Sequence, residues 1–192
     1  MENREVIDWV PDRRMAWWMN IVGVILTIGG IVGYAALFLW TQSGYVTVQL
    51  GVAELFGVLA MSVGVFALAW IHELLHGFAL RTLGFKPKYG ALMIGGIIPA
   101  FYCTSPGAVM SRGAFVYVAL LPGIVLGVVP IVWILAQWPG SGWLVIPAGL
   151  LLGGAVGDIF LTIRVLIAPR GTRVEDIRDG VRLHLPVGSS VS

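Results

Sequence analysis

The sequence has little charge for its length of 192 residues. Only 11% of the residues are Asp, Glu, Lys or Arg, whereas soluble domains contain about 25%. So few charged side chains cannot cover the surface of a soluble protein of this size. The same scarcity excludes intrinsic disorder, because disordered chains are polar and highly charged.

Other features exclude further classes of protein. A single cysteine excludes an intrachain disulfide, and the 26 glycines show no collagen period. The net charge of +2 gives no reason to expect a nucleic-acid partner. By contrast, 58% of the residues are hydrophobic and the mean hydropathy is +0.90. These values indicate an integral membrane protein.

Four apolar segments are long enough to cross a bilayer, which takes about 20 residues of helix. A turn at 138–143 separates the last two segments, and Pro169 and Gly171 end the fourth. We therefore expect an all-α integral membrane fold in one domain, residues 1–192. A polar tail at 170–192 should form short strands or stay unstructured. The predicted spans are about 17–40, 52–83, 114–137 and 143–168.

The basic residues predict the orientation of these spans. All 12 Lys and Arg fall on one side, and the opposite connectors, 41–50 and 138–142, contain none. Because basic loops stay in the cytoplasm, the charged side and both termini should be cytoplasmic. The residues concerned are Arg4, Arg13, Arg14, Arg81, Lys86, Lys88, Arg112, Arg164, Arg170, Arg173, Arg178 and Arg182.

The segment 85–113, between the second and third spans, is too apolar for an ordinary loop. It is rich in residues typical of strands and contains the pair Gly95-Gly96. We expect a membrane-associated β-hairpin or re-entrant loop resting against the helices. Such backbone is tolerated at membrane depth only where protein or a wet cavity satisfies it.

The second span carries an H-E-x-x-H motif, from His72 to His76. Histidines at positions i and i+4 lie on one face of a helix, so both imidazoles can reach one zinc ion. Glu73 lies near that face and can act as a general base toward water. Catalytic zinc usually has three protein ligands, so the chain must supply a third.

Asp158 is the candidate for the third ligand. The metzincin pattern requires a glycine and a histidine where this chain has Ala79 and Thr82, and the only Glu after the motif is Glu175, in the polar tail. A carboxylate inside a span is costly and points to function. At 1.5 Å per residue, Asp158 lies about 15 Å from the cytoplasmic end of its span and the motif histidines about 10–17 Å from theirs.

Each polar residue also has a simpler interpretation. The alternative for Asp158 is an ion pair with Arg164 or a bond to backbone. We interpret Glu54 as an interfacial residue, Cys103 as a small packing residue and His184 as a surface residue of the tail. The glycines Gly153, Gly154 and Gly157 should allow another helix to approach closely.

Several motifs together resemble a known family, the small prokaryotic integral-membrane zincin peptidases, related to the site-2-type intramembrane metalloproteases. The likeness covers roughly residues 60–185. It is specific mainly in the H-E-x-x-H motif and in the glycine-rich element that ends at Asp158. An Asn-Pro and Asp-Gly pattern found in larger site-2 proteases is missing here. The motifs are His72-Glu-Leu-Leu-His-Gly77, Tyr102-Cys-Thr-Ser105, Ala119-Leu-Leu-Pro122, Gly153-Gly-Ala-Val-Gly-Asp158 and Arg173-Val-Glu-Asp-Ile-Arg-Asp-Gly180.

The resemblance implies a prokaryotic cell-membrane enzyme with zinc held by His72, His76 and Asp158, and with Glu73 as the base. Its substrate would be a peptide or membrane protein cut near the cytoplasmic side, without a nucleic-acid partner. The alternatives are a non-catalytic protein that binds metal or partner helices, and a small ion transporter. The oligomeric state is open. Candidate substrate contacts on the 86–104 segment are Tyr89, Ala91, Met93, Tyr102 and Thr104.

Overall fold

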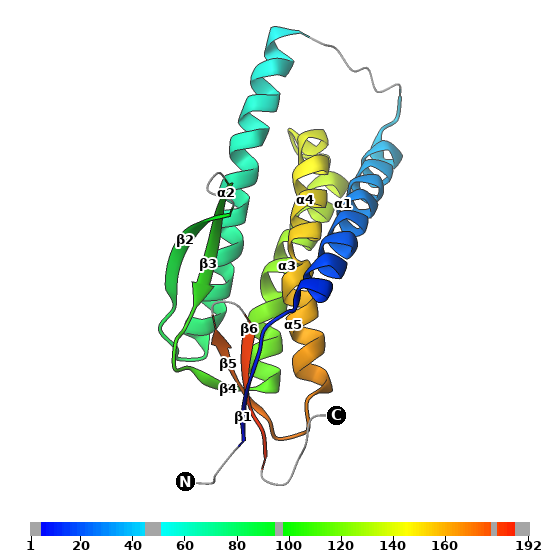
Figure 1. Ribbon diagram of the computed structural model, residues 1–192. Helices are drawn as coiled ribbons and strands as arrows, with labels where there is room; N and C mark the ends of the chain where they lie inside the picture. The colour runs from blue at the N-terminus through cyan, green and yellow to red at the C-terminus, as the bar shows by residue number, and fades with distance from the viewer. Residues whose placement is uncertain (1–4, 45–50, 95–97, 178–179, 187–192) are drawn as a thin grey trace. The chain divides into compact units, whose positions relative to one another are not determined.

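A computed structural model describes residues 5–44, 51–94, 98–177 and 180–186. The chain is mostly helical, and four helices are long and apolar enough to cross a membrane: Arg13–Thr41, Leu55–Thr82, Arg112–Leu135 and Ser141–Ile167 (Figure 1). This confirms four spanning-length helices near the predicted ranges.

The helices are α1 (Arg13–Thr41), α2 (Val52–Thr82), α3 (Arg112–Leu135), η1 (Ser141–Leu144), α4 (Val145–Gly154) and α5 (Val156–Ile167). The strands are β1 (Val6–Trp9), β2 (Lys88–Ile94), β3 (Ile98–Thr104), β4 (Val109–Ser111), β5 (Arg173–Ile177) and β6 (Gly180–His184).

Local sequence signals explain where α1 begins and where α2, the helix that carries the H-E-x-x-H motif, ends. The carboxylate of Asp12 accepts a 2.7 Å hydrogen bond from the backbone N–H of Met15, which caps the start of α1. Helix α2 ends as expected at Gly84, whose φ is +82°. The N–H of Phe85 then donates to the carbonyl of Leu80 at 3.0 Å, the pattern of a Schellman cap.

The fourth span is interrupted, whereas the sequence predicted one continuous helix. Helices α4 and α5 meet at Ala155, whose ψ of 0° departs from helical geometry. Two glycines, Gly153 and Gly154, precede this residue, and glycine is among the poorest helix formers. The interruption places Asp158 in the first turn of α5, where a carboxylate is favoured by the helix dipole.

The chain forms two compact units. The first contains residues 1–19, 73–122 and 157–192, and the second contains 20–72 and 123–156. In the second unit, close helix packing depends on small residues. A Cβ atom built on Gly153 would meet the carbonyl of Gly23 at 2.6 Å and the hydroxyl of Thr27, whereas a Cβ built on Gly154, or on Gly157 of the first unit, would meet nothing within 4 Å. The expected close approach is therefore confirmed at Gly153 alone.

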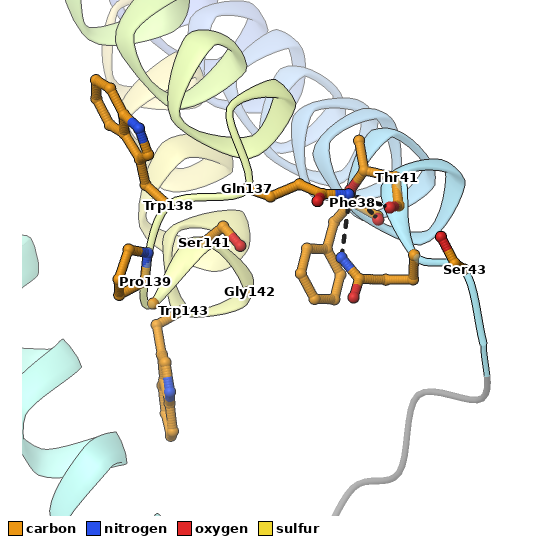
Figure 2. Close-up of a pocket in the computed structure, with 11 residues that line it drawn as sticks. Phe38, Thr41, Ser43, Gln137, Trp138, Pro139, Ser141, Gly142 and Trp143 are labelled. Atoms are coloured by element: carbon orange, nitrogen blue, oxygen red, sulfur yellow. Dashed lines mark hydrogen bonds between the residues drawn. The ribbon is translucent and has the colours of Figure 1, made fainter.

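The second unit also contains the predicted turn between the third and fourth spans. An open pocket of about 580 Å³ lies between the end of α1 and residues 137–143 (Figure 2). The side-chain amide of Gln137 donates to the backbone carbonyl of Thr41, and Gly140 supplies a left-handed turn with a φ of +77°. These contacts tie the turn to the end of α1.

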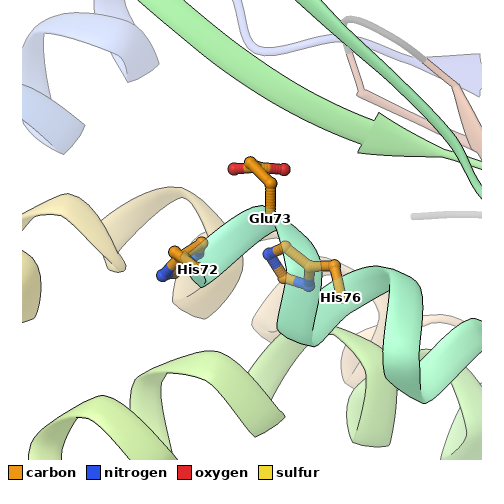
Figure 3. Close-up of side chains that lie close together, drawn as sticks. All are labelled: His72, Glu73 and His76. Carbon is orange, nitrogen blue, oxygen red and sulfur yellow. The ribbon is translucent and has the colours of Figure 1, made fainter. Parts of the chain in front are cut away.

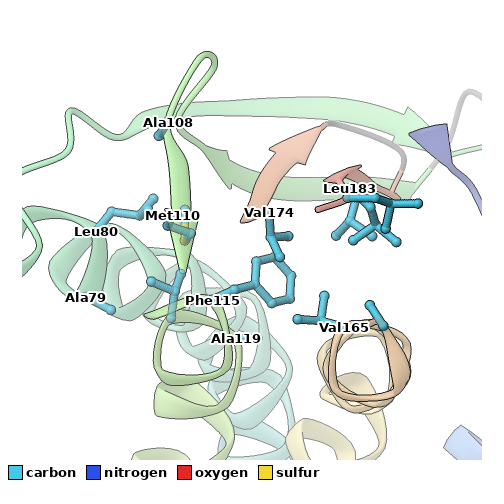
Figure 4. Close-up of a cluster of buried hydrophobic side chains, with 13 residues drawn as sticks. Ala79, Leu80, Ala108, Met110, Phe115, Ala119, Val165, Val174 and Leu183 are labelled. Atoms are coloured by element: carbon cyan, nitrogen blue, oxygen red, sulfur yellow. The ribbon is translucent and has the colours of Figure 1, made fainter. Parts of the chain in front are cut away.

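The first unit contains more strand than the sequence predicted. Strands β1, β6, β5 and β4 form an antiparallel sheet in that order, so residues of the expected polar tail belong to a folded layer. The short strands that were one expectation for the tail are present as β5 and β6, whereas the all-α prediction misses their pairing into a sheet. Their alternate residues Val174, Val181 and Leu183 are fully buried. They join residues of α2, α3 and α5 in one core (Figure 4).

The expected hairpin is present as β2 and β3. The two strands pair antiparallel, with Tyr89 opposite Cys103 and Lys88 opposite Thr104. Gly95 and Gly96 lie outside the described residues. The structure thus confirms the hairpin itself, and its placement at membrane depth stays a prediction.

Candidate metal centre

The H-E-x-x-H motif lies on α2, as its helical spacing predicts. The ligand atoms of His72, Glu73 and His76 all lie within 4.8 Å of one another. Figure 3 shows the two imidazoles on neighbouring turns of the helix, with the carboxylate of Glu73 between them and directed away from the helix axis. These groups are half-buried, so they form a cluster that water or a ligand can reach.

A backbone contact fixes the orientation of His76. Its Nδ1 lies 2.9 Å from the carbonyl oxygen of Val118 on α3. Because a carbonyl only accepts hydrogen bonds, Nδ1 carries a proton in this contact, and Nε2 is the nitrogen that would bind a metal. Metal-binding histidines commonly make this second contact, which fixes the tautomer and the ring.

The other ring nitrogen of His76 faces the predicted third ligand. His76 Nε2 lies 3.4 Å from Asp158 Oδ1, although Asp158 is outside the three-residue group on α2. The two side chains therefore lie close together, which agrees with the similar depths expected for them. The alternative partner of Asp158, Arg164, places its guanidinium 5.8 Å from the centre of the Trp9 ring.

The core of the first unit explains why these two side chains meet. His76 and Leu80 are one turn apart on α2, and Asp158, Leu161 and Val165 follow one face of α5. Leu80 and Val165 are buried in the core, and Leu161 packs against it. His76 thus lies one turn from Leu80, and Asp158 lies one turn from Leu161. Because these apolar side chains pack in the core, they fix the positions of the two polar groups.

Sequence reasoning missed Asp176, which it placed in a polar tail beside Glu175. On β5, Asp176 lies two residues after the buried Val174 and opposite the buried Val181, so it shares their face toward the helices. The pKa of Asp176 is raised to about 7, first by burial and to a lesser extent by the nearby charges of Asp158 and Glu73. Only Val174 is fully buried within residues 173–177, and two adjacent charged residues interrupt the alternation, so this strand has little signal in the sequence.

Cys103 behaves as the packing residue that we expected. It is half-buried against the core, and its pKa is raised to about 12, first by burial and then by the negative charge of Glu73. The thiol therefore stays protonated in the metal-free protein, as a buried packing residue does.

The remaining candidate contacts lie in the hairpin or in the sheet. Thr104 is buried, and its hydroxyl donates to the backbone carbonyl of Asp176 at 3.3 Å. Tyr89 and Tyr102 are half-buried and Ala91 is exposed. The side chains of Met93 and Glu54 lie outside the described residues.

Glu175 and His184 belong to the sheet. Glu175 accepts a 2.8 Å hydrogen bond from the backbone N–H of Gly107, and its Oε2 lies 3.6 Å from His184 Nε2. The side chain of His184 is only about 21% exposed, so our description of it as a surface residue is wrong. Neither residue belongs to the group on α2.

The donor set fits zinc. Two imidazole nitrogens and a carboxylate oxygen are ligands that catalytic zinc uses, and the contact of His76 Nδ1 with Val118 makes Nε2 the nitrogen that would bind a metal. Glu73 adds a carboxylate in the same group, which a purely structural zinc site does not need.

The comparisons with known proteins give one match. A family model described as "putative zincin peptidase" matches residues 65–173, a range that contains the motif on α2 and Asp158. No curated protein and no solved structure matches the chain.

Proposed function

The chain belongs to the putative zincin peptidase family, and we propose that it is an intramembrane zinc metalloprotease. Like site-2-type enzymes, it would hydrolyse peptide bonds of membrane-associated substrates near the cytoplasmic side. The observation that carries the proposal is the position of the motif. His72, Glu73 and His76 lie together on α2, a helix long and apolar enough to cross a membrane.

We assign His72, His76 and Asp158 as the residues that would hold zinc. The ion, when bound, supplies a Lewis acid that polarises a carbonyl and makes water more acidic. Two observations support the assignment: the contact of His76 Nδ1 with the Val118 carbonyl, which orients the ring, and the 3.4 Å distance from His76 to Asp158.

Glu73 is the general base of the proposed reaction. Its carboxylate takes a proton from the attacking water while the water oxygen bonds to the scissile carbonyl carbon. Glu73 then gives the proton to the amide nitrogen as the carbon–nitrogen bond breaks. The products are a carboxylate and an amine, so one water is consumed for each bond cut.

The substrate must present an extended segment to this site, because the carbonyls of a helix are hydrogen-bonded and shielded. We propose that the β2–β3 hairpin receives this segment by strand addition, which recognises backbone rather than sequence. Tyr89, Ala91, Met93, Tyr102 and Thr104 are the candidate contacts. The partner is therefore a membrane protein or peptide within the lipid bilayer.

The membrane orientation completes the proposal. The positive-inside rule places both termini and the sheet in the cytoplasm. Water would reach the site from the cytoplasmic face, because the motif lies closer to the cytoplasmic end of its predicted span than to the other end. We infer a prokaryotic cell membrane as the location, following the family resemblance.

The experiment is cleavage of a panel of membrane peptides by purified wild-type protein and by Glu73→Gln. We expect the variant to keep its zinc and to lose cleavage. Glu175→Gln is the matched control, since Glu175 binds Gly107 in the sheet, and it should cleave like wild type. Equal cleavage by wild type and Glu73→Gln would refute the assignment of Glu73. A non-catalytic metal-binding protein predicts no cleavage by any of them.

A further inference from the structure

Tyr89 and Gly77 join the hairpin to the motif helix. A Cβ atom built on Gly77 would meet the hydroxyl of Tyr89 and would lie 2.5 Å from its Cζ. The end of the phenol ring therefore occupies the space that any larger residue at position 77 would fill. Gly77 directly follows His76, so Tyr89 reaches α2 beside the candidate metal centre.

Glu73 lies on the same side of α2 as this contact. Gly77 follows Glu73 by four residues, and residues at this spacing are neighbours on one helical face. The Cα–Cβ bond of a helical residue tilts toward the N-terminus. The Tyr89 hydroxyl occupies the Cβ position of Gly77, so it lies on the side of Gly77 that faces the turn carrying Glu73. In Figure 3 the carboxylate of Glu73 is directed toward the strands of the hairpin.

A second observation places Glu73 against the hairpin. Cys103 is the direct partner of Tyr89 across the two strands, and residues opposite each other in an antiparallel pair share one face. The negative charge of Glu73 is among the causes that raise the pKa of the Cys103 thiol. The Tyr89–Cys103 pair and Glu73 therefore lie close together within the first unit.

We propose that Tyr89 is a positioning residue for Glu73, whose hydroxyl, seated over Gly77, donates a hydrogen bond that orients the carboxylate. A half-buried phenol needs a hydrogen-bond partner, and a carboxylate that accepts from it loses rotational freedom. The inference rests on the proposed function, because orienting Glu73 matters only if Glu73 is the general base.

The inference also explains the glycine that follows the motif. An alanine at position 77 would displace the phenol and with it the hydrogen-bond donor. Tyr89 belongs to β2, which is a candidate strand for substrate addition. One side chain thus links the strand that would hold the substrate to the helix that holds the base.

The test compares Tyr89→Phe, Gly77→Ala and their combination in full-length, zinc-loaded protein, with the membrane peptide that wild type cleaves fastest. Misplacing a catalytic group by about 1 Å can cost about 100-fold in rate, so we expect kcat to fall about 10- to 100-fold in Tyr89→Phe. KM and zinc content should not change. Gly77→Ala should fall similarly, and the double variant should be no worse than the poorer single variant, because both remove one interaction.

The control is Tyr117→Phe, which removes a hydroxyl that contacts Thr82 on the same helix at 3.3 Å. It should behave like wild type. Hydrogen exchange of residues 88–94 in the metal-free protein gives a readout independent of activity. Exchange should rise in Gly77→Ala, where the ring is displaced, and stay unchanged in Tyr89→Phe, where the ring keeps its seat.

The outcomes separate this inference from the proposed function. A wild-type kcat in Tyr89→Phe, with cleavage still abolished in Glu73→Gln, overturns the role of Tyr89 alone. Absence of cleavage by wild type overturns both. If Gly77→Ala loses its zinc, the test rests on Tyr89→Phe alone. A lower kcat with unchanged hydrogen exchange supports the role of Tyr89, and a wild-type kcat overturns it.

Discussion

His76 Nε2 lies 3.4 Å from Asp158 Oδ1, although one residue belongs to α2 and the other to the first turn of α5. The imidazole is held in this position by its other nitrogen, Nδ1, which contacts the carbonyl of Val118. Beneath the pair, Leu80 and Val165 are buried in a common core. The position of these two groups therefore follows from apolar packing.

The raised pKa of Asp176 predicts a pH dependence of stability. The carboxyl ionises near pH 3.8 in the unfolded chain and near 7 in the folded, metal-free protein. The folded state thus binds the proton more tightly, and this group's contribution to stability falls as the pH rises from about 4 to about 7. In EDTA-treated protein, Asp176→Asn should reduce the decline in the unfolding temperature between pH 5 and pH 8.

A control for this effect is Asp8→Asn. Asp8 is held ionised by Arg182, which lowers its pKa, so its titration is complete below this pH range. Wild type and Asp8→Asn should therefore decline alike from pH 5 to pH 8. An unchanged decline in Asp176→Asn would contradict the burial of its carboxyl against the site.

The packing of α4 on α1 predicts opposite results for two adjacent glycines. Gly153→Ala forces a methyl group against Thr27 and the backbone of Gly23, whereas Gly154→Ala meets nothing within 4 Å. Overpacking of this kind costs about 1–3 kcal/mol. Denaturation in detergent should show this loss for Gly153→Ala. Gly154→Ala should be neutral or slightly stabilising, because alanine is the better helix former. Equal losses in both variants would contradict the packing.

The proposed orientation predicts the accessibility of two exposed positions. In a Cys103→Ala background, Ser43→Cys should react with a membrane-impermeant thiol reagent in intact cells. Lys86→Cys should react only after lysis, because the basic side is cytoplasmic. Both side chains are exposed in the structure, so neither is shielded by the fold. The reverse labelling pattern would invert the topology, and with it the side from which water is proposed to enter.

The sequence alone predicted the parts of the fold that follow from composition and helical spacing. The four apolar helices and the shared face of His72 and His76 depend on local pattern. The depth of Asp158 required only the rise per residue of a helix. The hairpin followed from its apolar, strand-forming residues. The matched range of 65–173 is also close to the region of resemblance.

The remaining features depend on contacts between distant segments. The pairing of the sheet could not be predicted. In β5 the two apolar residues, Val174 and Ile177, are three positions apart and separated by two charged residues, so they do not alternate as in a typical strand. The pairing of β5 with β4 and β6 is tertiary. The Val118 carbonyl is a backbone group without a sequence signature. Gly77 and Tyr89 were each visible in the sequence, but their contact depends on how the hairpin folds back on α2.

The central claim is that His72, His76 and Asp158 hold a catalytic zinc ion, and metal content tests it most directly. Purified wild-type protein, Glu73→Gln and the control Glu175→Gln should each contain about one zinc per chain, as a three-ligand site requires. His72→Ala and Asp158→Asn should lose it. Zinc retained by both of these variants, or no zinc in wild type, would contradict the account.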